Sequence, residues 1–375
     1  MNGRPIRVTF LGLRGFPKVQ GGVETHAEQL CPLLQEMGCE VEVIVRAPYM
    51  DAGTGASWRG VRFVRLWAPK SKGLEAVLHT FVGVLVAGLR RPDILHIQAI
   101  GPGLMTPLAR LLGLKVVITH HGPDYERQKW GRFARTVLRL GEKLGMRWSQ
   151  GRIVISDVIR RLVRANQDRD STLIPNGVAL PPMPATREAL DAFGLDAGRY
   201  VLLVSRLVPE KRHLDLIEAF RRAALPGWKL AIVGASDHPD AYVQSLLDAA
   251  KRTPGVVCTG FQSGTWLAEL YGHAGMFVLP SSHEGHPIAL LEALSYGLPV
   301  IASDIPANLE VGLPAEHYFP LGDSAVLAER LVRFSSVPQD AEAHEARRQW
   351  VVSRYDWRNV AERTLEVYRK VLKRT

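Results

Sequence analysis

Cysteine is scarce in this chain, and it does not occur in any metal-binding pattern. The 375 residues contain three cysteines, Cys31, Cys39 and Cys258, which do not have the spacing of metal ligands and make no disulfide framework. An Asp-x-Asp metal motif is also absent from the sequence. We therefore expect a protein of the reducing cytoplasm with no bound metal.

Long hydrophobic runs are missing as well. The most apolar longer stretch, residues 76–89, has about 14 residues, whereas a membrane-spanning helix needs about 20. We interpret this stretch as a buried helix. Near the N-terminus, Arg4 and Arg7 precede an apolar run of only a few residues, so no secretory signal is expected.

Positive charge is abundant, and it is unevenly distributed. Residues 1–180 hold 26 Lys and Arg against 14 Asp and Glu, a net charge of +12, while residues 181–375 hold 21 against 23, a net charge of −2. The first half is therefore expected to have an anionic partner of its own. No module that combines aromatic and basic residues for nucleic-acid binding is visible, so nucleic acid is not expected.

Short apolar segments recur along the chain in two series, with helical patterns between them. Such alternation predicts an α/β protein with two doubly wound parallel sheets, and the proline-rich residues 180–184 predict a linker between them. We expect domains at 1–180 and 181–354, followed by an amphipathic terminal helix at about 355–375. The expected strands are 6–11, 41–46, 61–66, 94–98, 116–119 and 153–156, then 200–205, 230–234, 256–261, 278–280 and 299–302. Residues 47–60 are expected to form a flexible connection.

Two glutamates, separated by seven intervening residues, lie in a strand, loop, helix and strand unit at residues 278–304. Gly285 and Pro287 place Glu284 in the loop, whereas Glu292 falls in the following helix. Both carboxylates then lie at the carboxyl end of the sheet, with the backbone N–H groups of the helix start between them. Carboxylates that flank an anion site suit a nucleotide-sugar, which carries hydroxyls on either side of a diphosphate. Two solvated surface glutamates remain the alternative.

Three further segments place polar or small residues at predicted strand ends. Arg206 and Lys211 lie five residues apart where a strand passes into a helix, and could clamp a diphosphate; a solvated basic loop is the alternative. His121 follows the carboxyl end of another predicted strand, where it could face a bound ligand. The alternative is a helix cap or a hydrogen-bonded histidine of the loop. The loop at residues 12–26 is rich in glycine without the G-x-G-x-x-G fingerprint, and it could approach a phosphate or be an ordinary turn. His26 is a weaker candidate.

The segment 125–148 combines apolar residues at helical spacing with a strongly basic composition. A basic amphipathic helix of this kind can lie on an anionic membrane surface. The alternative is a helix whose apolar side faces the core. The apolar residues are Trp130, Phe133, Val137, Leu140 and Leu144, and the basic ones are Arg127, Lys129, Arg132, Arg135, Arg139, Lys143 and Arg147.

The stretch EGHPIALLEALSYGLPVIASDIP, which begins at Glu284, resembles the Glu-x7-Glu signature of the retaining glycosyltransferases of family four. That resemblance implies the GT-B fold, in which two Rossmann-like domains face each other across a cleft. Residues 12–24 are similar to the Gly-x-Arg-Gly-x-Pro…Gly-Gly-x-Glu start of a rhamnosyltransferase-like branch of this family. Residues 174–178 also resemble the family, as the lead into the interdomain crossing.

The resemblance implies a role for each candidate residue. Arg206 and Lys211 would neutralise the leaving diphosphate, Glu284 would orient the donor sugar, and His121 would contact it as the active-site histidine. Glu292 would hold the ribose hydroxyls. The remaining donor-binding positions are Gly21 and Gly22 at the diphosphate, Gly260 and Phe261 at the nucleobase, and Gly285, His286 and Ile288 at the helix start.

The activity so implied is transfer of a hexose or deoxyhexose from a nucleotide-diphosphate sugar, without a metal or other cofactor. The acceptor would be a lipid-diphosphate-linked saccharide of bacterial surface polysaccharide, reached on the inner face of the plasma membrane, with Arg132, Arg135 and Arg139 on the acceptor and membrane side. Gly285-His286-Pro287 departs from the Gly-Phe-Gly of many relatives and removes one backbone donor, which favours a rhamnosyl or related donor. A sugar-nucleotide epimerase, a phosphorylase and a non-catalytic nucleotide-sugar-binding protein are the alternatives.

Overall fold

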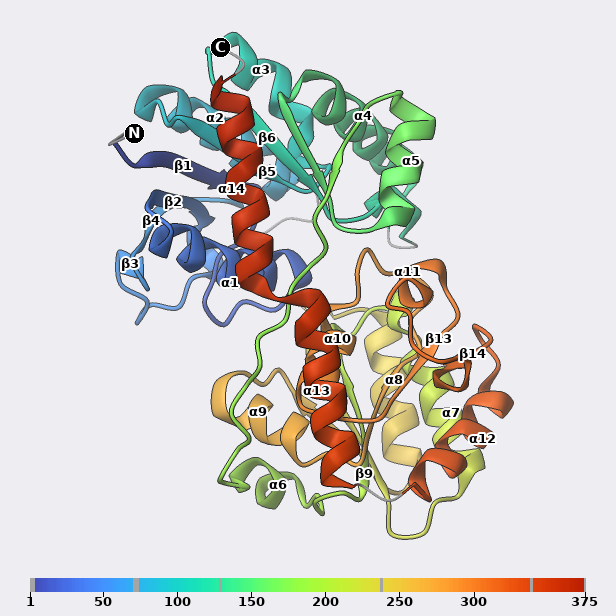
Figure 1. The fold of residues 1–375 in the computed structure, drawn as a ribbon. Coiled ribbons are helices and arrows are strands. Elements are labelled where there is room, and N and C mark those ends of the chain that lie inside the picture. The colour runs from blue at the N-terminus through green and yellow to red at the C-terminus, as the bar shows by residue number, and fades with distance from the viewer. Residues whose placement is uncertain (1–3, 70–73, 128–129, 237–238, 338–339, 374–375) are drawn as a thin grey trace. The chain divides into compact units, whose positions relative to one another are not determined.

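The computed structural model describes residues 4–69, 74–127, 130–236, 239–337 and 340–373, and its chain divides into two compact units (Figure 1). Unit 1 comprises residues 1–176 and 357–375, and unit 2 comprises residues 177–356. The chain therefore enters unit 2 just before the proline-rich segment expected to be the linker. It returns to unit 1 for its last helix.

Unit 1 contains a sheet in the order β3-β4-β2-β1-β5-β6-β7-β8, which is parallel except for the β3–β4 pair. The strands from the predicted apolar runs are all present. Residues 47–60, expected to be a flexible connection, contain a 3₁₀ turn at Ala47–Tyr49 and the edge strand β3, and the rest of this segment has no helix or strand. The bounds are β1 Ile6–Leu11, β2 Cys39–Arg46, β3 Ser57–Trp58, β4 Val61–Leu66, β5 Ile94–Gln98, β6 Val116–His120, β7 Gly151–Val154 and β8 Thr172–Leu173.

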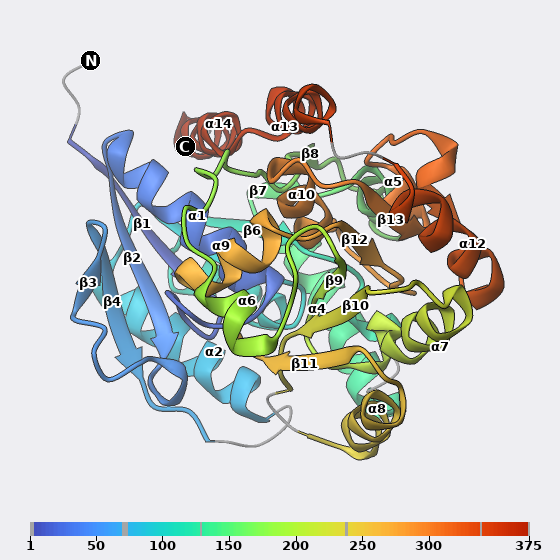
Figure 2. The ribbon, with the colours of Figure 1, turned by 90° about the horizontal axis from the view of Figure 1, so that it is seen from below.

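Helices cover both faces of this sheet, and each face has its own apolar core. Helices α1 and α14 pack on one face through residues such as Leu34 and Tyr368. Helices α2 to α5 cover the other through residues such as Val84 and Met146, and Figure 2 shows α14 and α2 on opposite sides. The bounds are α1 Gly22–Glu36, α2 Leu74–Arg90, α3 Thr106–Leu111, α4 Arg132–Trp148, α5 Asp157–Gln167 and α14 Trp357–Lys373, with 3₁₀ turns at Pro102–Met105 and Asp124–Glu126.

The prediction that residues 76–89 form a buried helix is wrong in one respect. They belong to α2, but only the inward side of α2 is buried, at residues such as Val84 and Ala87, while Phe81 is 42% and Leu89 87% exposed. The reason is that α2 lies in an outer layer, where only one side of a helix has a sheet to pack against. Within the described residues, no helix is both long enough and apolar enough to cross a membrane.

Helix α4 also differs from the core-facing alternative considered for it. Phe133 and Leu140 are 83% and 45% exposed, so this apolar side does not face the core. The buried side instead carries Glu142, Met146 and two glycines. A Cβ at Gly141 would collide with the Ile100 carbonyl oxygen, which explains how α4 approaches the backbone so closely. Lys129 lies outside the described residues.

Unit 2 contains a parallel sheet in the order β11-β10-β9-β12-β13-β14. Strands β9, β10 and β11 run outward in one direction, whereas β12, β13 and β14 run outward in the other. The order therefore reverses between β9 and β12, and such a switch point opens a crevice at the carboxyl ends of the two strands. The strands are β9 Tyr200–Val204, β10 Lys229–Val233, β11 Val256–Gly260, β12 Met276–Leu279, β13 Val300–Ser303 and β14 Tyr318–Phe319.

The helices of unit 2 flank this sheet on both faces, and the predicted fold class of two doubly wound parallel-sheet domains is confirmed. Helix α10 begins at Ile288, as the sequence predicts. The helices are α6 Glu188–Phe193, α7 His213–Ala223, α8 Ala241–Arg252, α9 Gly264–Gly272, α10 Ile288–Ser295, α11 Pro306–Leu309, α12 Ser324–Ser335 and α13 Ala341–Tyr355, with 3₁₀ turns at Pro209–Lys211 and Ala315–His317.

Candidate active site

Lys211 and Glu284 meet at the switch point of unit 2. Lys211 ends the turn after β9, Glu284 lies in the loop after β12, and the Lys211 Nζ to Glu284 Oε1 distance is 2.5 Å. Burial raises the pKa of Glu284, but the charge and hydrogen bond of Lys211, together with a hydrogen bond from Ser281, offset it, so the pKa of the carboxyl is held below its usual range. The structure thus brings together two of the four residues predicted to be catalytic.

The two loops that carry this pair are joined through their backbones. The Ser282 N–H donates to the Glu210 carbonyl oxygen at 2.8 Å, and Glu210 itself is buried. Glu210 directly precedes Lys211, and Ser282 lies two residues before Glu284, so this hydrogen bond joins the two loops beside the ion pair. Arg206 lies half-buried in the same loop as Lys211.

His213, the first residue of α7, connects the end of the Lys211 loop to its start and to α8. The sequence analysis did not predict a role for it. Its Nε2 lies 2.9 Å from Ser205 Oγ, and its Nδ1 lies 3.0 Å from the Tyr242 hydroxyl. Burial, and then the Lys211 charge, lower the pKa of His213 to about 3, so the ring is neutral. No local pattern identifies it, since Tyr242 is distant in sequence.

Glu292 lies half-buried on α10, where Tyr271 holds one of its oxygens. The Tyr271 hydroxyl donates to Glu292 Oε2 at 3.0 Å, and its ring stacks on Tyr296 with centroids 5.3 Å apart. Burial raises the pKa of Tyr271 well above its ordinary value, followed by the effect of the Glu292 charge, so this hydroxyl remains a donor. Tyr271 is a supporting residue that the sequence analysis missed.

The sequence predicts that the backbone N–H groups at the start of α10 face an anion, but at least one of them is already used within the chain. The Ile288 N–H donates to the His286 carbonyl oxygen at 3.0 Å, and Pro287 has no N–H to offer. His286 is buried, its ring packs 5.5 Å from Tyr355, and burial lowers its pKa to about 4. The part played by Gly285 and Ile288 as backbone donors therefore remains a prediction.

Gly260 and Phe261 lie at the same edge of the sheet but farther along it. Gly260 ends β11, which is separated from β9 by β10, and Phe261 is 40% exposed beside it. The positive φ of Gly260, 73°, favours glycine at this turn. These two residues are therefore at the carboxyl edge, apart from the loops of Lys211 and Glu284.

In unit 1, the glycine-rich loop after β1 is organised by Arg14 and Glu24. Arg14 Nε donates to Glu24 Oε1 at 3.1 Å, and another guanidinium nitrogen of Arg14 donates to the Gln20 carbonyl oxygen. Gly21 has a φ of 152°, and a Cβ there would collide with the Glu24 carboxylate. The ion pair therefore requires glycine at Gly21, and Gly22 opens α1 directly after it. Arg14 and Glu24 are both positions of the Gly-x-Arg-Gly…Gly-Gly-x-Glu motif, so the motif was the sequence signal that could have identified them.

His121 lies just after β6, half-buried beside the buried ring of His26. Its Nε2 is 2.7 Å from Gln98 Oε1 at the end of β5, and the ring of His26 meets it edge-on at 4.8 Å. His26 Nδ1 is in turn 2.9 Å from Asn176 Oδ1. Burial, followed by neighbouring histidines, lowers the pKa of His121 well below its ordinary value, and burial lowers that of His26 to about 4. Both imidazoles are therefore neutral at physiological pH.

The predicted membrane-side arginines are all on α4 but differ in their surroundings. Arg132 is exposed, Arg135 is partly buried, and Arg139 lies with its guanidinium 5.2 Å from the ring centre of Tyr125. Among the described residues, no group of three or more His, Cys, Asp or Glu could hold a metal ion.

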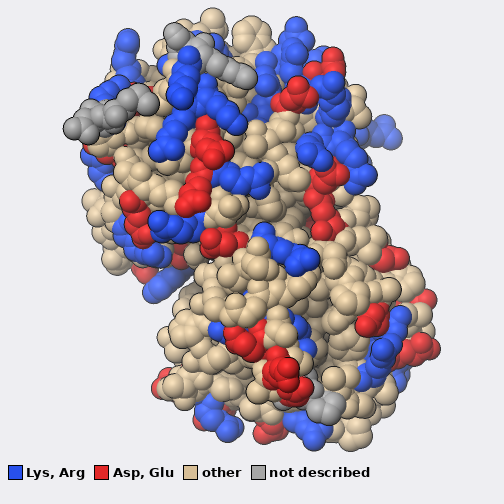
Figure 3. All heavy atoms as spheres, in the orientation of Figure 1, with Lys and Arg blue, Asp and Glu red and all other residues tan. Residues whose placement is uncertain are grey.

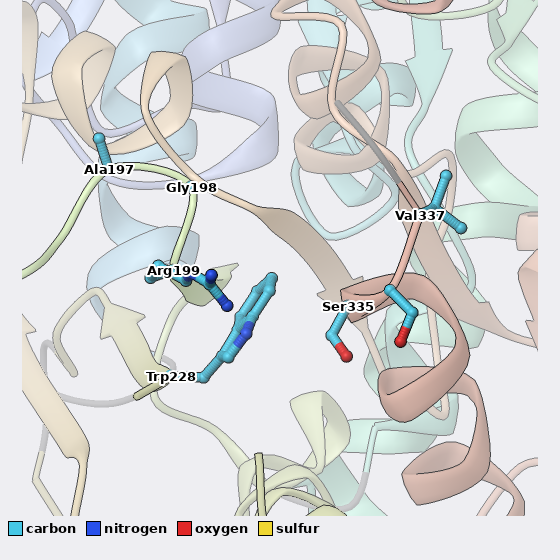
Figure 4. Close-up of a pocket in the computed structure, with 7 residues that line it drawn as sticks. Ala197, Gly198, Arg199, Trp228, Ser335 and Val337 are labelled. Carbon is cyan, nitrogen blue, oxygen red and sulfur yellow. The ribbon is translucent and has the colours of Figure 1, made fainter. Parts of the chain in front are cut away.

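A hollow of about 330 Å³ in unit 2 lies away from these residues (Figure 4). Arg199 and Trp228, which line it, directly precede β9 and β10. The hollow therefore lies at the amino ends of the strands, whereas ligands of open α/β sheets bind at the carboxyl ends. We do not assign it to the active site.

Comparison with known proteins agrees with this arrangement. Residues 20–180 match the family described as Glycosyltransferase Family 4, and residues 189–355 match Glycosyl transferases group 1. The chain is 27% identical over 369 residues to a phosphatidyl-myo-inositol mannosyltransferase of Mycobacterium leprae, covering 94% of each chain.

Solved structures share the fold. A sucrose-phosphate synthase from Thermosynechococcus elongatus superposes with a TM-score of 0.82 at 21% identity, over 98% of this chain and 100% of that one. HepE from Anabaena, in complex with UDP and glucose, superposes with a TM-score of 0.78 at 17% identity, over 97% and 100% of the two chains.

Proposed function

We propose that this chain, which belongs to the nucleotide-sugar-dependent glycosyltransferases of family 4, transfers a hexose or deoxyhexose to a saccharide acceptor with retention of anomeric configuration. The observation that carries the proposal is the Lys211–Glu284 pair at the switch point of unit 2. A cation and a carboxylate at this position suit the diphosphate and the sugar hydroxyls of one donor molecule.

In this proposal, each member of the pair neutralises the other until the donor binds. When the donor binds, the Lys211 ammonium pairs with the diphosphate oxygens, and Arg206 supplies a second positive charge. Glu284 then accepts hydrogen bonds from hydroxyls of the sugar. Negative charge grows on the diphosphate as the bond to the sugar breaks. Fixed positive charge at that point lowers the barrier more than it stabilises the bound donor.

Unit 2 would supply the other donor contacts. Glu292, held in place by Tyr271, would accept hydrogen bonds from the ribose hydroxyls, and Gly260 and Phe261 would contact the nucleobase. Gly285, His286 and Ile288 would face the diphosphate. Because Pro287 offers no N–H, we favour a deoxygenated hexose such as a rhamnosyl group, which requires fewer donors.

Unit 1 would provide the acceptor side. His121, neutral and oriented by Gln98, would contact the transferred sugar, and Gly21 and Gly22 would allow the backbone to approach the diphosphate. No covalent nucleophile is assigned, so the acceptor hydroxyl would attack on the face that the diphosphate leaves.

We further propose a lipid-diphosphate-linked saccharide acceptor of bacterial surface polysaccharide, reached at the inner face of the plasma membrane. Two observations support it. The relative from Mycobacterium leprae is named for a lipid, phosphatidyl-myo-inositol. Unit 1 also holds 32 Lys and Arg against 16 Asp and Glu, a net charge of +16, whereas unit 2 has 15 against 21. On the face drawn in Figure 3, Lys and Arg gather over unit 1, and Arg132, Arg135 and Arg139 of α4 would face anionic lipid.

Slow donor hydrolysis tests this function, because water can replace the unidentified acceptor. UDP-, GDP- and dTDP-linked hexoses and deoxyhexoses would each be incubated with the enzyme, and the released sugar followed by NMR before its anomers equilibrate. We expect one donor to yield nucleoside diphosphate and the sugar in its original anomeric form. An inverted anomer would contradict the retaining mechanism, and conversion of the donor to an epimer would identify an epimerase.

A further inference from the structure

Helix α2 presents a line of large apolar side chains to solvent. Val77, Phe81, Leu85 and Leu89 recur at every fourth residue and so lie along one side of the helix. They are 38%, 42%, 39% and 87% exposed. An outer helix ordinarily carries polar residues on this side, so we distinguish these four residues as the α2 stripe.

The apolar surface continues onto helix α3. Leu111 is 83% and Leu112 40% exposed at the end of α3. A Cβ at Gly88 would lie 3.0 Å from Leu112 Cδ1, so Leu112 packs against the last turn of α2 at Gly88, the residue before Leu89. The exposed apolar residues of the two helices therefore form one surface, and continuous patches of this kind mark a docking site.

Accessible charge around the stripe is positive. The sequence has no acidic residue between Glu75 and Asp93. Glu75 is buried against Arg46 at 2.7 Å, and Asp93 is 15% exposed and held by Arg4 at 2.7 Å. Arg90 is 52% exposed, and Arg91 beside it is exposed as well. An occupant of this surface must therefore tolerate positive charge or carry negative charge.

A second copy of this chain does not meet that requirement, since it would bring together two copies of unit 1, each of which carries a net charge of +16. An anionic bilayer does. Its headgroups neutralise arginines at the ends of a helix, while its acyl region accepts the apolar side.

We propose that the α2 stripe, with Leu111 and Leu112 of α3, inserts into the surface of an anionic bilayer. This inference deepens the proposed function, on which it rests for the lipid-linked acceptor, and it assigns the apolar part of membrane binding to α2. Helix α4, which covers the same face of the sheet of unit 1, would contribute charge. Two elements on one face bind far better than either alone, because both contacts form in one encounter.

Vesicle flotation with the full chain tests the inference. The double variant Phe81→Gln/Leu85→Gln removes the centre of the stripe and retains helix propensity. Leu180→Gln/Val332→Gln in unit 2 is the matched control, because these residues are 42% and 45% exposed. We expect the stripe variant to bind vesicles of phosphatidylcholine with phosphatidylglycerol at least about tenfold more weakly, and the control to bind as wild type does.

Three results separate the outcomes. Unchanged flotation of the stripe variant would overturn the inference. So would a wild-type dimer in sedimentation that the variant dissociates without any loss of flotation, because the stripe would then be an interface between copies. Thermal stabilisation by nucleotide-sugars is measured on the same proteins. The proposed reaction would be wrong if no nucleotide-sugar stabilised the wild-type protein. The proposed membrane surface would still be supported if the stripe variant bound vesicles more weakly than wild type.

Discussion

Lys211 and Glu284, 73 residues apart in sequence, form an ion pair with 2.5 Å between Nζ and Oε1. Their side chains are only 18% and 11% exposed, so the pair is weakly screened by water and salt. The two loops that carry it follow β9 and β12, the strands between which the order of the sheet reverses. Each residue is thus held at the place where the fold binds ligands.

Replacing Lys211 by alanine is expected to abolish turnover. Loss of one charge that stabilises the leaving diphosphate should lower kcat by about 10²- to 10³-fold or more, with little change in the circular dichroism spectrum of the folded protein. Lys251→Ala, an exposed lysine on α8, is the matched control. Unaltered turnover in Lys211→Ala would refute the role of this residue at the diphosphate.

Removing the Tyr271 hydroxyl is expected to weaken donor binding more than catalysis. Tyr271→Phe keeps the stack on Tyr296 but leaves Glu292 without this donor. Since one hydrogen bond to a charged group contributes about 1.5–3 kcal/mol, KM for the donor should rise about tenfold or more while kcat changes little.

Tyr296→Phe serves as the control, because it removes the hydroxyl from the neighbouring ring of the same stack and leaves the Tyr271–Glu292 hydrogen bond in place. An equal rise in KM in both variants would contradict a specific role for that hydrogen bond.

Buried histidines should make the protein less stable in mild acid. Burial lowers the pKa of His26 to about 4 and that of His213 to about 3, whereas an unfolded histidine titrates near 6.5. Below that pH the unfolded state binds the proton more strongly. The free energy of unfolding should therefore fall from about pH 6.5 down to the folded pKa, by up to ~1.4 kcal/mol per pH unit for each such group.

Denaturant unfolding at several pH values measures this slope. His213→Gln should reduce it in the window between pH 6.5 and 4, relative to the same change at the half-buried His317, whose pKa is lowered less. An identical slope in wild type and His213→Gln would mean that His213 is not the neutral buried group described.

Reversing charge on α4 should abolish binding to anionic vesicles if this helix attracts them. The variant Arg132→Glu/Arg135→Glu/Arg139→Glu changes the net charge of unit 1 by six units, and each basic residue near a membrane contributes about 1 kcal/mol. Flotation at low salt measures the loss. Arg221→Glu/Arg222→Glu/Arg252→Glu in unit 2 makes the same change in total charge, and equal loss in both would contradict a specific role for α4.

The longer strands were predictable because each is a short apolar run bounded by turn residues, and both parallel sheets followed from their alternation with helices. The two-residue strands β3, β8 and β14 were not predicted. Exposure was not predictable either. The 14 residues at 76–89 include only two polar ones, His79 and Thr80, so their pattern does not reveal that Phe81 and Leu85 are exposed. Similarly, Phe133 and Leu140 have the spacing of a buried face, yet α4 packs through its glycines and Glu142 instead.

The site residues themselves were found by their resemblance to a family motif, but their supports were not. Gln98 beside His121 and Tyr271 beside Glu292 are brought together by the fold, across 23 and 21 residues of sequence. Neither has a local signature. Arg14 and Glu24 could have been chosen as candidates from the sequence, because they are the charged positions of the glycine-rich motif. Only the structure shows that they form an ion pair.

The central claim is that unit 2 binds a nucleotide-sugar donor without a metal, and thermal unfolding across UDP-, GDP- and dTDP-linked sugars in the presence of a chelator tests it most directly. At a hundredfold excess over its dissociation constant, a donor should stabilise the folded protein by about 2.7 kcal/mol, and Lys211→Ala should reduce that stabilisation. If no nucleotide-sugar raises the unfolding temperature of the wild-type protein, the assignment of the Lys211–Glu284 loops as a donor site is wrong.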